Sequence, residues 1–365
     1  MTSFIKKYPF NFSLLTLNKK RNAVVGIDIT SSAVKLVELS KSSKGYHVES
    51  IAIVPIHFNE VTSQFTETYI IGQTIQKTLK KSNTSARRAV VAVGGASVIT
   101  KSILIPAGLS EDEIMEQIII DIPKHLQLSS DDINIDFLIQ GVNEINTNLL
   151  NVLLVAARKE SVEYKIAILK HARLEAKIIE VETFTIANAL SLLASQLPYH
   201  VHDNTIAVVD IGANVTTLHV IHRSQSIYTR ELAFGGNELT SQIAQAYQLT
   251  PSEAELAKKQ GNLPKNYLID ILEPFKQRIV QQIQRSMQFF STSQHAHRIE
   301  SIILSGGCAA ISGIDMLVSN TLNLPTYVAN PFIDMTYSPH IHPQYLNEHS
   351  SSMLVACGLA LRNFD

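Results

Sequence analysis

The chain contains the same short pattern twice, and this repeat constrains the possible folds more than any other feature. Residues 25–39 and 208–221 each read as a β-branched strand that ends in Asp-Ile, then small or polar residues, then a second alternating strand. The pattern predicts a β-hairpin whose tight turn exposes backbone N–H groups beside a carboxylate. That carboxylate is Asp28 in one copy and Asp210 in the other.

A single turn of this kind would be weak evidence, because aspartate is common in turns and can hydrogen-bond to its own backbone. Two copies, one in each half of the chain, instead predict two related domains that face each other across a nucleotide. Backbone donors in the turns would hold phosphate oxygens, and the carboxylates would hold a hydrated Mg²⁺.

Length and composition narrow the class of protein. At 365 residues the chain exceeds what one hydrophobic core usually supports, so two domains are expected. Hydrophobic residues at 45% suit globular cores, and the formal net charge of −1 shows no basic footprint of a nucleic-acid-binding protein. The two cysteines, Cys308 and Cys357, exclude a disulfide framework and favour a reducing compartment. No apolar run approaches the roughly 18 residues that span a bilayer, and no signal peptide is recognisable, so we expect a soluble cytosolic protein.

The order of predicted elements divides the chain into lobes. Residues 1–21 are expected to form a leader, either frayed or in contact with a membrane surface or a partner. A strand–helix–strand–strand–helix pattern predicts a compact insertion, whose helix begins at a capping box of Ser110 and Glu113. The predicted division is a leader at 1–21, a first lobe at 22–203, a second lobe at 204–345 and a closing helix at 346–365. The insertion lies within the first lobe, at about 88–175. The second lobe contains a helical subdomain at about 235–298, which includes a long helix at 268–292.

Three motifs in a fixed order resemble those of the actin-like ATPase superfamily. They are the turn after Asp28, the run Asp210-x-Gly212-x-x-x-Thr216 and the run Ile303-Leu-Ser-Gly306-Gly307. In that superfamily they are the phosphate-1, phosphate-2 and adenosine motifs. Between the last two, Ala254-Glu255-x-x-Lys258 resembles the adenosine-binding helix of heat-shock chaperone ATPases and FtsA. The resemblance implies an α/β, two-lobed actin-like ATPase fold of duplicated ribonuclease-H-like domains, with an FtsA-type small α/β insertion in the first lobe.

Further motifs, spread over most of the chain, narrow the resemblance to the PilM family of type IV pilus assembly proteins. They are Val34-Lys35-Leu-Val-Glu-Leu39, Ile105-Pro-Ala-Gly-Leu109, Gly235-Gly-Asn-Glu-Leu-Thr240 and Cys357-Gly-Leu-Ala-Leu-Arg362. The resemblance implies a cytoplasmic protein, peripheral to the inner membrane, that binds ATP with Mg²⁺. It also implies docking on the cytoplasmic N-terminal peptide of the inner-membrane protein PilN, in a groove between the first-lobe core and the insertion. Such a scaffold links the motor side of the pilus machinery to the alignment complex and meets the membrane only through partners; its oligomeric state stays open.

The resemblance assigns ligand-binding roles to individual residues. The β- and γ-phosphates would be held by Thr30, Ser31, Ser32 and Lys35, and Mg²⁺ by Asp28 and Asp210 through water. Gly212 and Asn214 would bring backbone close to phosphate, with Thr216 completing the turn. Adenine or the α-phosphate would lie on Gly306 and Gly307, and the ribose or base side would be met by Gly235, Gly236, Glu255 and Lys258. Each glycine pair also suits a tight strand–helix turn, and Glu255 with Lys258 also suits a surface ion pair at helical spacing.

Two further points concern the strength of binding and the chemistry. Many superfamily members have glycine after Asp-Ile in the first turn, whereas this chain has Thr30, and a β-branched residue resists positive φ. We therefore expect a less open turn and weaker nucleotide binding. Glu182 is the nearest candidate for orienting a hydrolytic water, with Glu180 as a weaker alternative, although Glu182 also suits a carboxylate that complements a helix N-terminus. Whether the protein is an enzyme stays open, and any ATPase rate is expected to be slow.

Other functions fit parts of the pattern. An FtsA-like filament protein is expected to carry a C-terminal amphipathic membrane helix, which the run Arg362-Asn-Phe-Asp365 does not supply. A sugar or acetate kinase needs an aspartate base and an acceptor pocket, for which no convincing candidate stands out. A nucleotide-free scaffold like the cytoplasmic domain of GspL is disfavoured by the intact set of nucleotide motifs. The His-x-His pairs at 200–202, 295–297 and 340–342 offer too few ligands for a closed zinc site, and Cys308 is expected to be an apolar filler.

Overall fold

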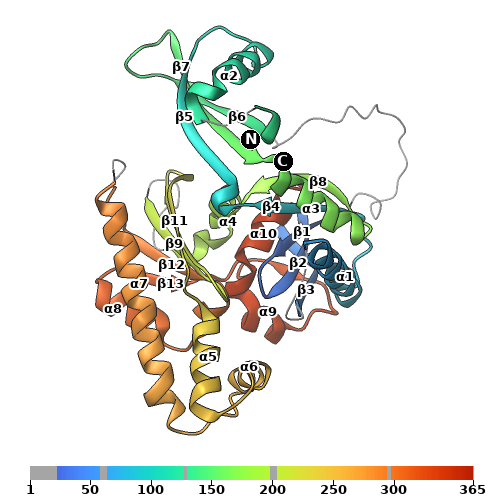
Figure 1. Ribbon diagram of the computed structural model, residues 1–365, viewed down its shortest axis with the longest axis vertical. Coiled ribbons are helices and arrows are strands. Elements are labelled where there is room, and N and C mark those ends of the chain that lie inside the picture. The colour runs from blue at the N-terminus through green and yellow to red at the C-terminus, as the bar shows by residue number, and fades with distance from the viewer. Residues whose placement is uncertain (1–22, 58–63, 127–129, 198–203, 294–296, 365) are drawn as a thin grey trace.

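The computed structural model describes residues 23–57, 64–126, 130–197, 204–293 and 297–364, and it shows a molecule of two lobes (Figure 1). The predicted leader at 1–21 lies outside the described residues, as do residues 198–203 beside the predicted boundary between the lobes. The first-lobe sheet contains β1 (Val24–Ile29), β2 (Ala33–Ser42), β3 (Gly45–Pro55), β4 (Arg88–Val93), β8 (Glu175–Val181) and β14 (Thr336–Tyr337). The second-lobe sheet contains β9 (Thr205–Ile211), β10 (Thr216–His222), β11 (Gln225–Leu232), β12 (Ser301–Ser305) and β13 (Thr326–Val328).

The two sheets follow one plan, which confirms the repeat predicted from the hairpins. The strand order is β14-β3-β2-β1-β4-β8 in the first lobe and β11-β10-β9-β12-β13 in the second. In each sheet a three-stranded antiparallel meander is continued by parallel strands, β4 and β8 beside β1, and β12 and β13 beside β9. The carboxyl ends of β1 and β9 therefore hold equivalent places in the two lobes.

Two helices bury one face of the first-lobe sheet. α1 (Gln64–Ser82) and α3 (Lys159–His171) supply Ile75 and Ile168 to a core that also contains Ile27 of β1 and Val91 of β4. These side chains are almost fully buried, and burial of each large aliphatic side chain contributes roughly 1.5–3 kcal/mol. The α3 helix is thereby held directly against the sheet that carries Asp28.

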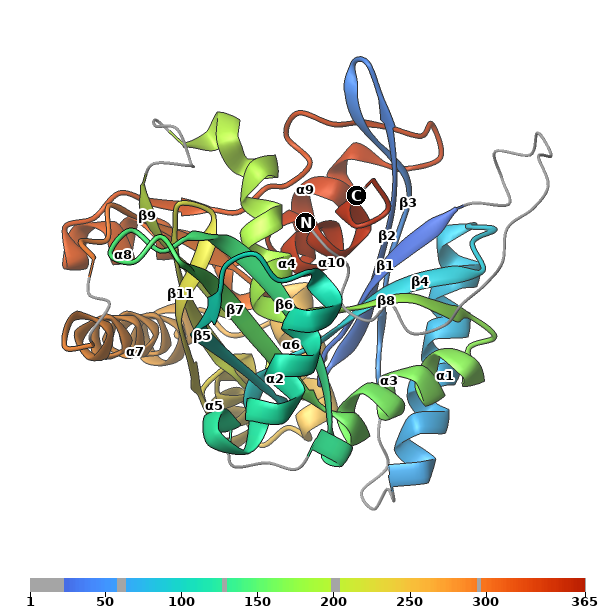
Figure 2. The same cartoon turned by 90° about the horizontal axis from the view of Figure 1, so that it is seen from above.

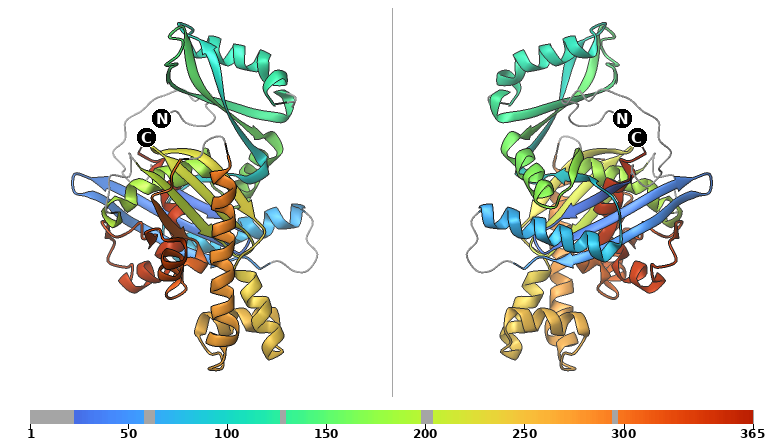
Figure 3. Two further views of the ribbon diagram at one scale, coloured as in Figure 1. Left: turned by 90° about the vertical axis from the view of Figure 1, so that its left-hand side faces the viewer. Right: turned by 90° about the vertical axis from the view of Figure 1, so that its right-hand side faces the viewer.

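The insertion forms a third sheet that projects from the first lobe (Figure 3). It has the order β5-β7-β6, from β5 (Val98–Pro106), β6 (Ile133–Val142) and β7 (Leu149–Arg158), and α2 (Glu111–Leu126) packs on it through Ile114 and Ile118. The predicted capping box is confirmed, because the Glu113 carboxylate accepts from the Ser110 amide and the Ser110 hydroxyl accepts from the Glu113 amide. The separate sheet spans only residues 98–158, less than the predicted 88–175, since β4 and β8 pair within the first-lobe sheet.

The helices of the second lobe are α5 (Gly236–Tyr247), α6 (Pro251–Gln260), α7 (Glu273–Ser291) and α8 (Ile314–Leu322). In Figure 1, α5, α6 and α7 extend below the second-lobe sheet, and α8 lies at its side. Phe275, Ile279 and Ile283 on one face of α7 belong to the second-lobe core. The predicted helix at 268–292 is confirmed, except that its first five residues, Leu268–Leu272, form a π-helical turn before α7.

Two helices join the lobes. α4 (Glu182–Ala189) and α10 (Leu354–Leu361) lie between the two large sheets (Figure 2). They contribute Ile186 and Leu359 to a core that contains side chains of both sheets. The predicted closing helix is α10, and it packs backbone to backbone: a Cβ on Gly358 would lie 2.3 Å from the Thr185 carbonyl oxygen of α4. A Cβ on Gly26 of β1 would lie 2.4 Å from the Ala356 carbonyl oxygen of α10. Short α9 (Pro343–His349) lies before α10 in the chain.

Candidate functional site

The two hairpins bring Asp28 and Asp210 to one site between the lobes. Lys35, the cross-strand partner of Asp28, places its Nζ 2.9 Å from Asp28 Oδ2. Burial disfavours a charged ammonium, but the carboxylates of Asp28 and Asp210 outweigh it and raise the pKa of Lys35. Ser305, at the end of β12, donates from its hydroxyl to Asp210 Oδ1 at 2.7 Å. The ammonium of Lys35 is therefore attracted by one carboxylate from each lobe.

Glu182 lies at the same site as the first residue of α4. Burial raises the pKa of its carboxyl to about 7, and repulsion by the carboxylates of Asp28 and Asp210 adds to this. Lys165 of α3 acts in the opposite direction and favours the charged form of Glu182. A carboxyl group with a pKa near neutrality is suited to accept a proton from water, which is the role predicted for Glu182.

The weaker candidate, Glu180, is committed to a different contact. Its Oε2 lies 2.6 Å from Nε of Arg362, and the two side chains are only 4% and 3% exposed. Its Oε1 also accepts a hydrogen bond from the Val181 amide. Glu180 thus ties β8 to the residue that follows α10, so of the two predicted candidates only Glu182 faces the Asp28–Asp210 site.

The first turn is closed by its own threonine. The Thr30 amide donates to the Ala33 carbonyl at 3.0 Å, and the Thr30 hydroxyl accepts from the Ser32 and Ala33 amides. None of the residues from Ile29 to Ala33 has a positive φ, in agreement with the expectation for a β-branched residue. Ser31 and Ser32 are exposed at the tip of the turn, where their hydroxyls are accessible to phosphate.

The second turn is held from two sides. The Gly212 amide donates to the Val215 carbonyl at 2.9 Å, and the buried Thr216 hydroxyl donates to the Phe234 carbonyl at 2.8 Å. The Asn214 side chain accepts from the Asn237 amide group at 2.6 Å. Thr216 therefore supports the turn from within, while Asn214 links it to the start of α5.

The glycines of the site divide into two kinds. A Cβ on Gly235 would lie 2.5 Å from the Ala213 carbonyl oxygen, and one on Gly306, whose φ is +88°, would lie 2.4 Å from the Ile211 carbonyl oxygen. These two positions need glycine because three loops meet there backbone to backbone. Gly307 differs, because it is exposed and a Cβ there would meet no atom within 4 Å. Gly307 is thus the position in the predicted adenosine motif whose surroundings are open.

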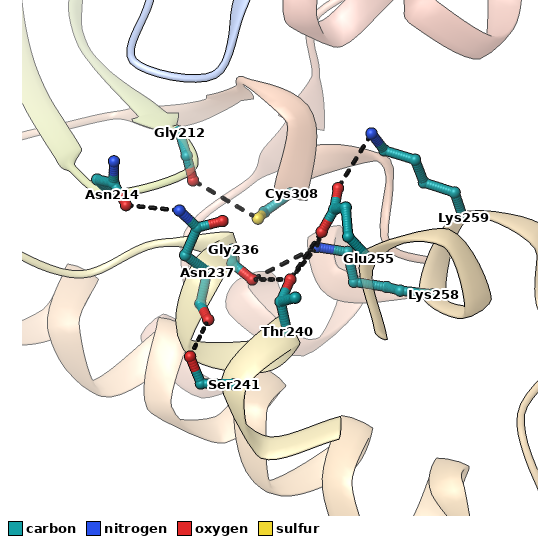
Figure 4. A network of polar contacts seen from close by, with 10 residues as sticks. All are labelled: Gly212, Asn214, Gly236, Asn237, Thr240, Ser241, Glu255, Lys258, Lys259 and Cys308. Carbon is teal, nitrogen blue, oxygen red and sulfur yellow. Dashed lines mark hydrogen bonds and ion pairs between the residues drawn. The ribbon is translucent and has the colours of Figure 1, made fainter. Parts of the chain in front are cut away.

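Polar contacts join the predicted adenosine-side residues (Figure 4). Glu255 Oε2 accepts from the Thr240 hydroxyl at 2.7 Å, and Lys258 Nζ lies 2.7 Å from the same hydroxyl oxygen. Lys258 also reaches the Gly236 carbonyl at 3.5 Å, so the pair is anchored to α5 and is more than a surface ion pair. Burial raises the pKa of the Cys308 thiol to about 11, which leaves it uncharged, and a Cβ on Gly236 would approach its Sγ to 2.9 Å.

A cavity of about 640 Å³ adjoins Asp28 and Glu182. It also contains Glu67 of α1, Lys165 of α3 and Glu231 of β11, which the sequence motifs did not indicate. The one sequence signal for Lys165 was a lysine on the inward face of a helix, three residues from the buried Val162 and from the buried Ile168. The remaining lining residues are Ile29, Ala92, Val93, Gly94, Gly95, Ser97, Glu160, Ser161 and Tyr164.

Duplicated sheets, one hairpin carboxylate from each, and helices that join the lobes define a protein of the actin-like ATPase fold. The chain belongs to the family of type IV pilus assembly protein PilM, whose model matches residues 26–364. A solved PilM–PilN type IV pilus biogenesis complex is similar, with 25% sequence identity, a TM-score of 0.75, and coverage of 94% of this chain and 98% of that chain.

More distant structures share the fold alone. The ethanolamine utilization protein EutJ from Carboxydothermus hydrogenoformans is 16% identical, with a TM-score of 0.54 and coverage of 92% of this chain and 88% of its own. A diol dehydratase-reactivating factor in nucleotide-free form is 11% identical, with a TM-score of 0.54 and coverage of 94% and 100%. Among the helices of the described residues, none is long and apolar enough to cross a membrane.

Proposed function

We propose that the protein binds ATP with Mg²⁺ between its lobes and acts as a cytoplasmic scaffold of type IV pilus biogenesis at the inner membrane. The observation that carries the proposal is the convergence of Asp28 and Asp210, one from each lobe, on Lys35 and Glu182. Such an arrangement places fixed negative and positive groups around the point where two lobes meet. It is suited to a ligand that itself combines phosphate charge with a divalent cation.

The donor set fits Mg²⁺ that arrives with a nucleotide. Within the described ranges no group of three or more His, Cys, Asp or Glu side chains is placed to hold a metal by itself. Mg²⁺ keeps several waters and usually binds through one or two carboxylates together with substrate phosphates. Asp28 and Asp210 would hold the ion through water. Lys35 and the hydroxyls of Ser31 and Ser32 would bind the phosphates, and Mg²⁺ would neutralise part of the phosphate charge. The fit supports a bound nucleotide, and in any hydrolysis Glu182 would orient the attacking water.

The adenosine side is supported by the open position at Gly307 and by the anchored pair of Glu255 and Lys258. Gly307 lies between the closely packed Gly306 and Cys308, so an adenine or α-phosphate could pass over its backbone without meeting a side chain. Lys258 and Glu255 lie on α6 next to the Gly236 carbonyl, where both can reach a ribose. The roles of Gly212, Asn214, Gly235 and Gly236 in this proposal are to shape the loops that carry these groups.

The proposed partner is the cytoplasmic N-terminal peptide of PilN. Support comes from the family and from the similarity to a solved complex that contains PilN. The proposed groove lies where the insertion leaves the first-lobe core, near the connections Gly94–Ser97 and Arg158–Ser161. Nucleotide would bias the relative position of the lobes and so the affinity for the peptide, and any turnover would be slow.

Calorimetry with ATP and Mg²⁺ tests the nucleotide proposal. Asp210→Asn keeps an acceptor for the Ser305 hydroxyl but removes the charge, so we expect Mg²⁺-dependent binding to weaken by roughly 10-fold or more. Gly307→Val should block the adenosine side, because the new side chain would occupy the open position, while the fold is retained. Asp334→Asn, at an exposed site, is the matched control. Nucleotide affinity that is unchanged in both site variants would show that the nucleotide binds elsewhere.

A further inference from the structure

The cavity beside Asp28 lies at the hinge of the insertion. Both chain connections between the first lobe and the insertion line it, Gly94 to Ser97 on the way in and Glu160 to Lys165 on the way out. Glu231 of β11 reaches it from the second lobe, within 3.0 Å of where a Cβ on Gly95 would lie. A group that binds in this cavity therefore contacts all three parts of the molecule.

The outgoing connection presents one helix face to the cavity. Its four lining residues, Glu160, Ser161, Tyr164 and Lys165, are spaced so that they share one side of α3. The α3 helix begins directly after β7, the central strand of the insertion sheet, so the insertion and this face are covalently continuous. Further along the same side of α3, Ile168 and Leu169 are fixed in the first-lobe core.

The charges of the cavity are unequal. Its lining contains the carboxylates of Asp28, Glu67, Glu160, Glu182 and Glu231, and a single cation, Lys165. Lys35, the other lysine near the site, is paired with Asp28 at 2.9 Å. The carboxylate of Glu67 accepts a hydrogen bond from the Tyr164 hydroxyl.

Lys165 itself is partly buried and lies in the field of these carboxylates. Among the residues that the structure describes, no carboxylate lies at ion-pair distance from its ammonium. Burial lowers the pKa of Lys165, and attraction by Asp28, Glu182 and Glu67 opposes this. An anion that enters beside Asp28 would make a direct contact with this ammonium, and that contact would offset the free-energy cost of burying the charge.

We propose that Lys165 binds the terminal phosphate of the nucleotide, so that the protein distinguishes ATP from ADP at the hinge of the insertion. The inference rests on the proposed function, since it requires nucleotide phosphates between Asp28 and Asp210. The terminal phosphate would replace the carboxylates as the partner of Lys165, and α3 would carry the change to the insertion. ADP lacks this phosphate and would leave Lys165 in its present surroundings.

Calorimetric affinities of ATP and ADP, each with Mg²⁺, test this role in the full chain. Lys165→Met retains the length of the side chain and removes its charge. We expect it to weaken ATP binding by roughly 10- to 100-fold, because a charge-assisted hydrogen bond contributes about this factor to affinity. ADP binding should change by less than about 3-fold. Lys165→Arg should restore much of the preference for ATP. Lys170→Met, on the exposed end of α3, is the matched control.

Hydrogen exchange adds a second readout that a merely structural role would not change. In the unsubstituted protein, ATP should slow exchange of amides 94–98 and 158–165 more than ADP does, and Lys165→Met should abolish this difference. Equal weakening of ATP and ADP, or no weakening of either, would overturn the inference while leaving the proposed nucleotide site in place. Absence of any nucleotide binding by the unsubstituted protein would overturn both. Thermal unfolding of each variant verifies that it is folded.

Discussion

The carboxyl group of Glu182 changes its charge close to neutral pH. Burial, with the neighbouring carboxylates of Asp28 and Asp210, raises its pKa to about 7. In the unfolded chain the same group ionises at an ordinary, lower pH. The native state therefore holds a proton that the unfolded state has already lost, and the stability of the nucleotide-free protein falls as pH rises through this window.

Glu182→Gln tests this assignment without any ligand. The substitution keeps the shape and removes the charge that is unfavourable above the native pKa. We expect the variant to be more stable than the parent at pH near 8, by roughly 1–2 kcal/mol, and the difference to vanish at pH near 4, below the pKa of the unfolded chain. Chemical denaturation at both pH values measures it, with the exposed Glu163→Gln as the control on α3. A difference that is the same at both pH values would show that Glu182 does not titrate between them.

The same residue would limit any hydrolysis of ATP. Only the ionised carboxylate can accept a proton from water, so the rate should rise through neutral pH, and Glu182→Gln should lower it by roughly 10²- to 10⁴-fold. A phosphate-release assay with protein and ATP·Mg²⁺ across this pH range measures both effects. If residual turnover has the same pH dependence in the variant, another group orients the water.

At the scale of elements, the contact between α4 and α10 determines how firmly the lobes are joined. Gly358 brings α10 to the backbone of α4, with no room for a Cβ beside the Thr185 carbonyl. Gly358→Ala should therefore destabilise the protein by about 1–3 kcal/mol, although alanine is intrinsically the better helix former. Denaturant unfolding measures the change. Gly307→Ala is the matched control, since its Cβ would meet no neighbour and should leave stability nearly unchanged.

Which elements the sequence predicts depends on how local their determinants are. The hairpins that carry Asp28 and Asp210 follow from strand periodicity and turn residues, and the capping box at Ser110 follows from four consecutive residues. The limits of the insertion cannot be predicted in this way, because the strands within 88–175 have similar hydrophobic patterns whichever sheet they join. Only tertiary pairing assigns β4 and β8 to the first lobe.

The candidate site divides in the same way. Asp28, Lys35 and Asp210 belong to short motifs, so sequence reasoning could single them out, and the attraction of Lys35 to the carboxylates of both lobes brings them together. Lys165 and Glu231 reach the cavity from elements that are distant in sequence, one from α3 and the other from β11. Their approach depends on how the insertion and the second lobe pack against the first, which no local pattern specifies.

At the scale of the whole molecule, the two lobes oppose each other with like charges. Asp28 and Glu182 stand on the first-lobe side, and Asp210 and Glu231 on the second, with mutual repulsion that contributes to the raised pKa of Glu182. A nucleotide with Mg²⁺ would cancel part of this repulsion and favour a closer approach of the lobes. Because the insertion hinge lines the same cavity, closure would also reposition the proposed PilN groove.

We therefore expect ATP·Mg²⁺ and a synthetic N-terminal peptide of the cognate PilN to bind with coupled affinities. Typical couplings of about 1–3 kcal/mol would change the peptide affinity by roughly 5- to 150-fold. Titration of the peptide with and without nucleotide measures the factor, and the reverse titration must give the same one because the coupling is reciprocal. Asp210→Asn should bind the peptide but lose the coupling. Peptide binding of equal strength with and without nucleotide would instead describe a scaffold whose partner groove is independent of its cleft.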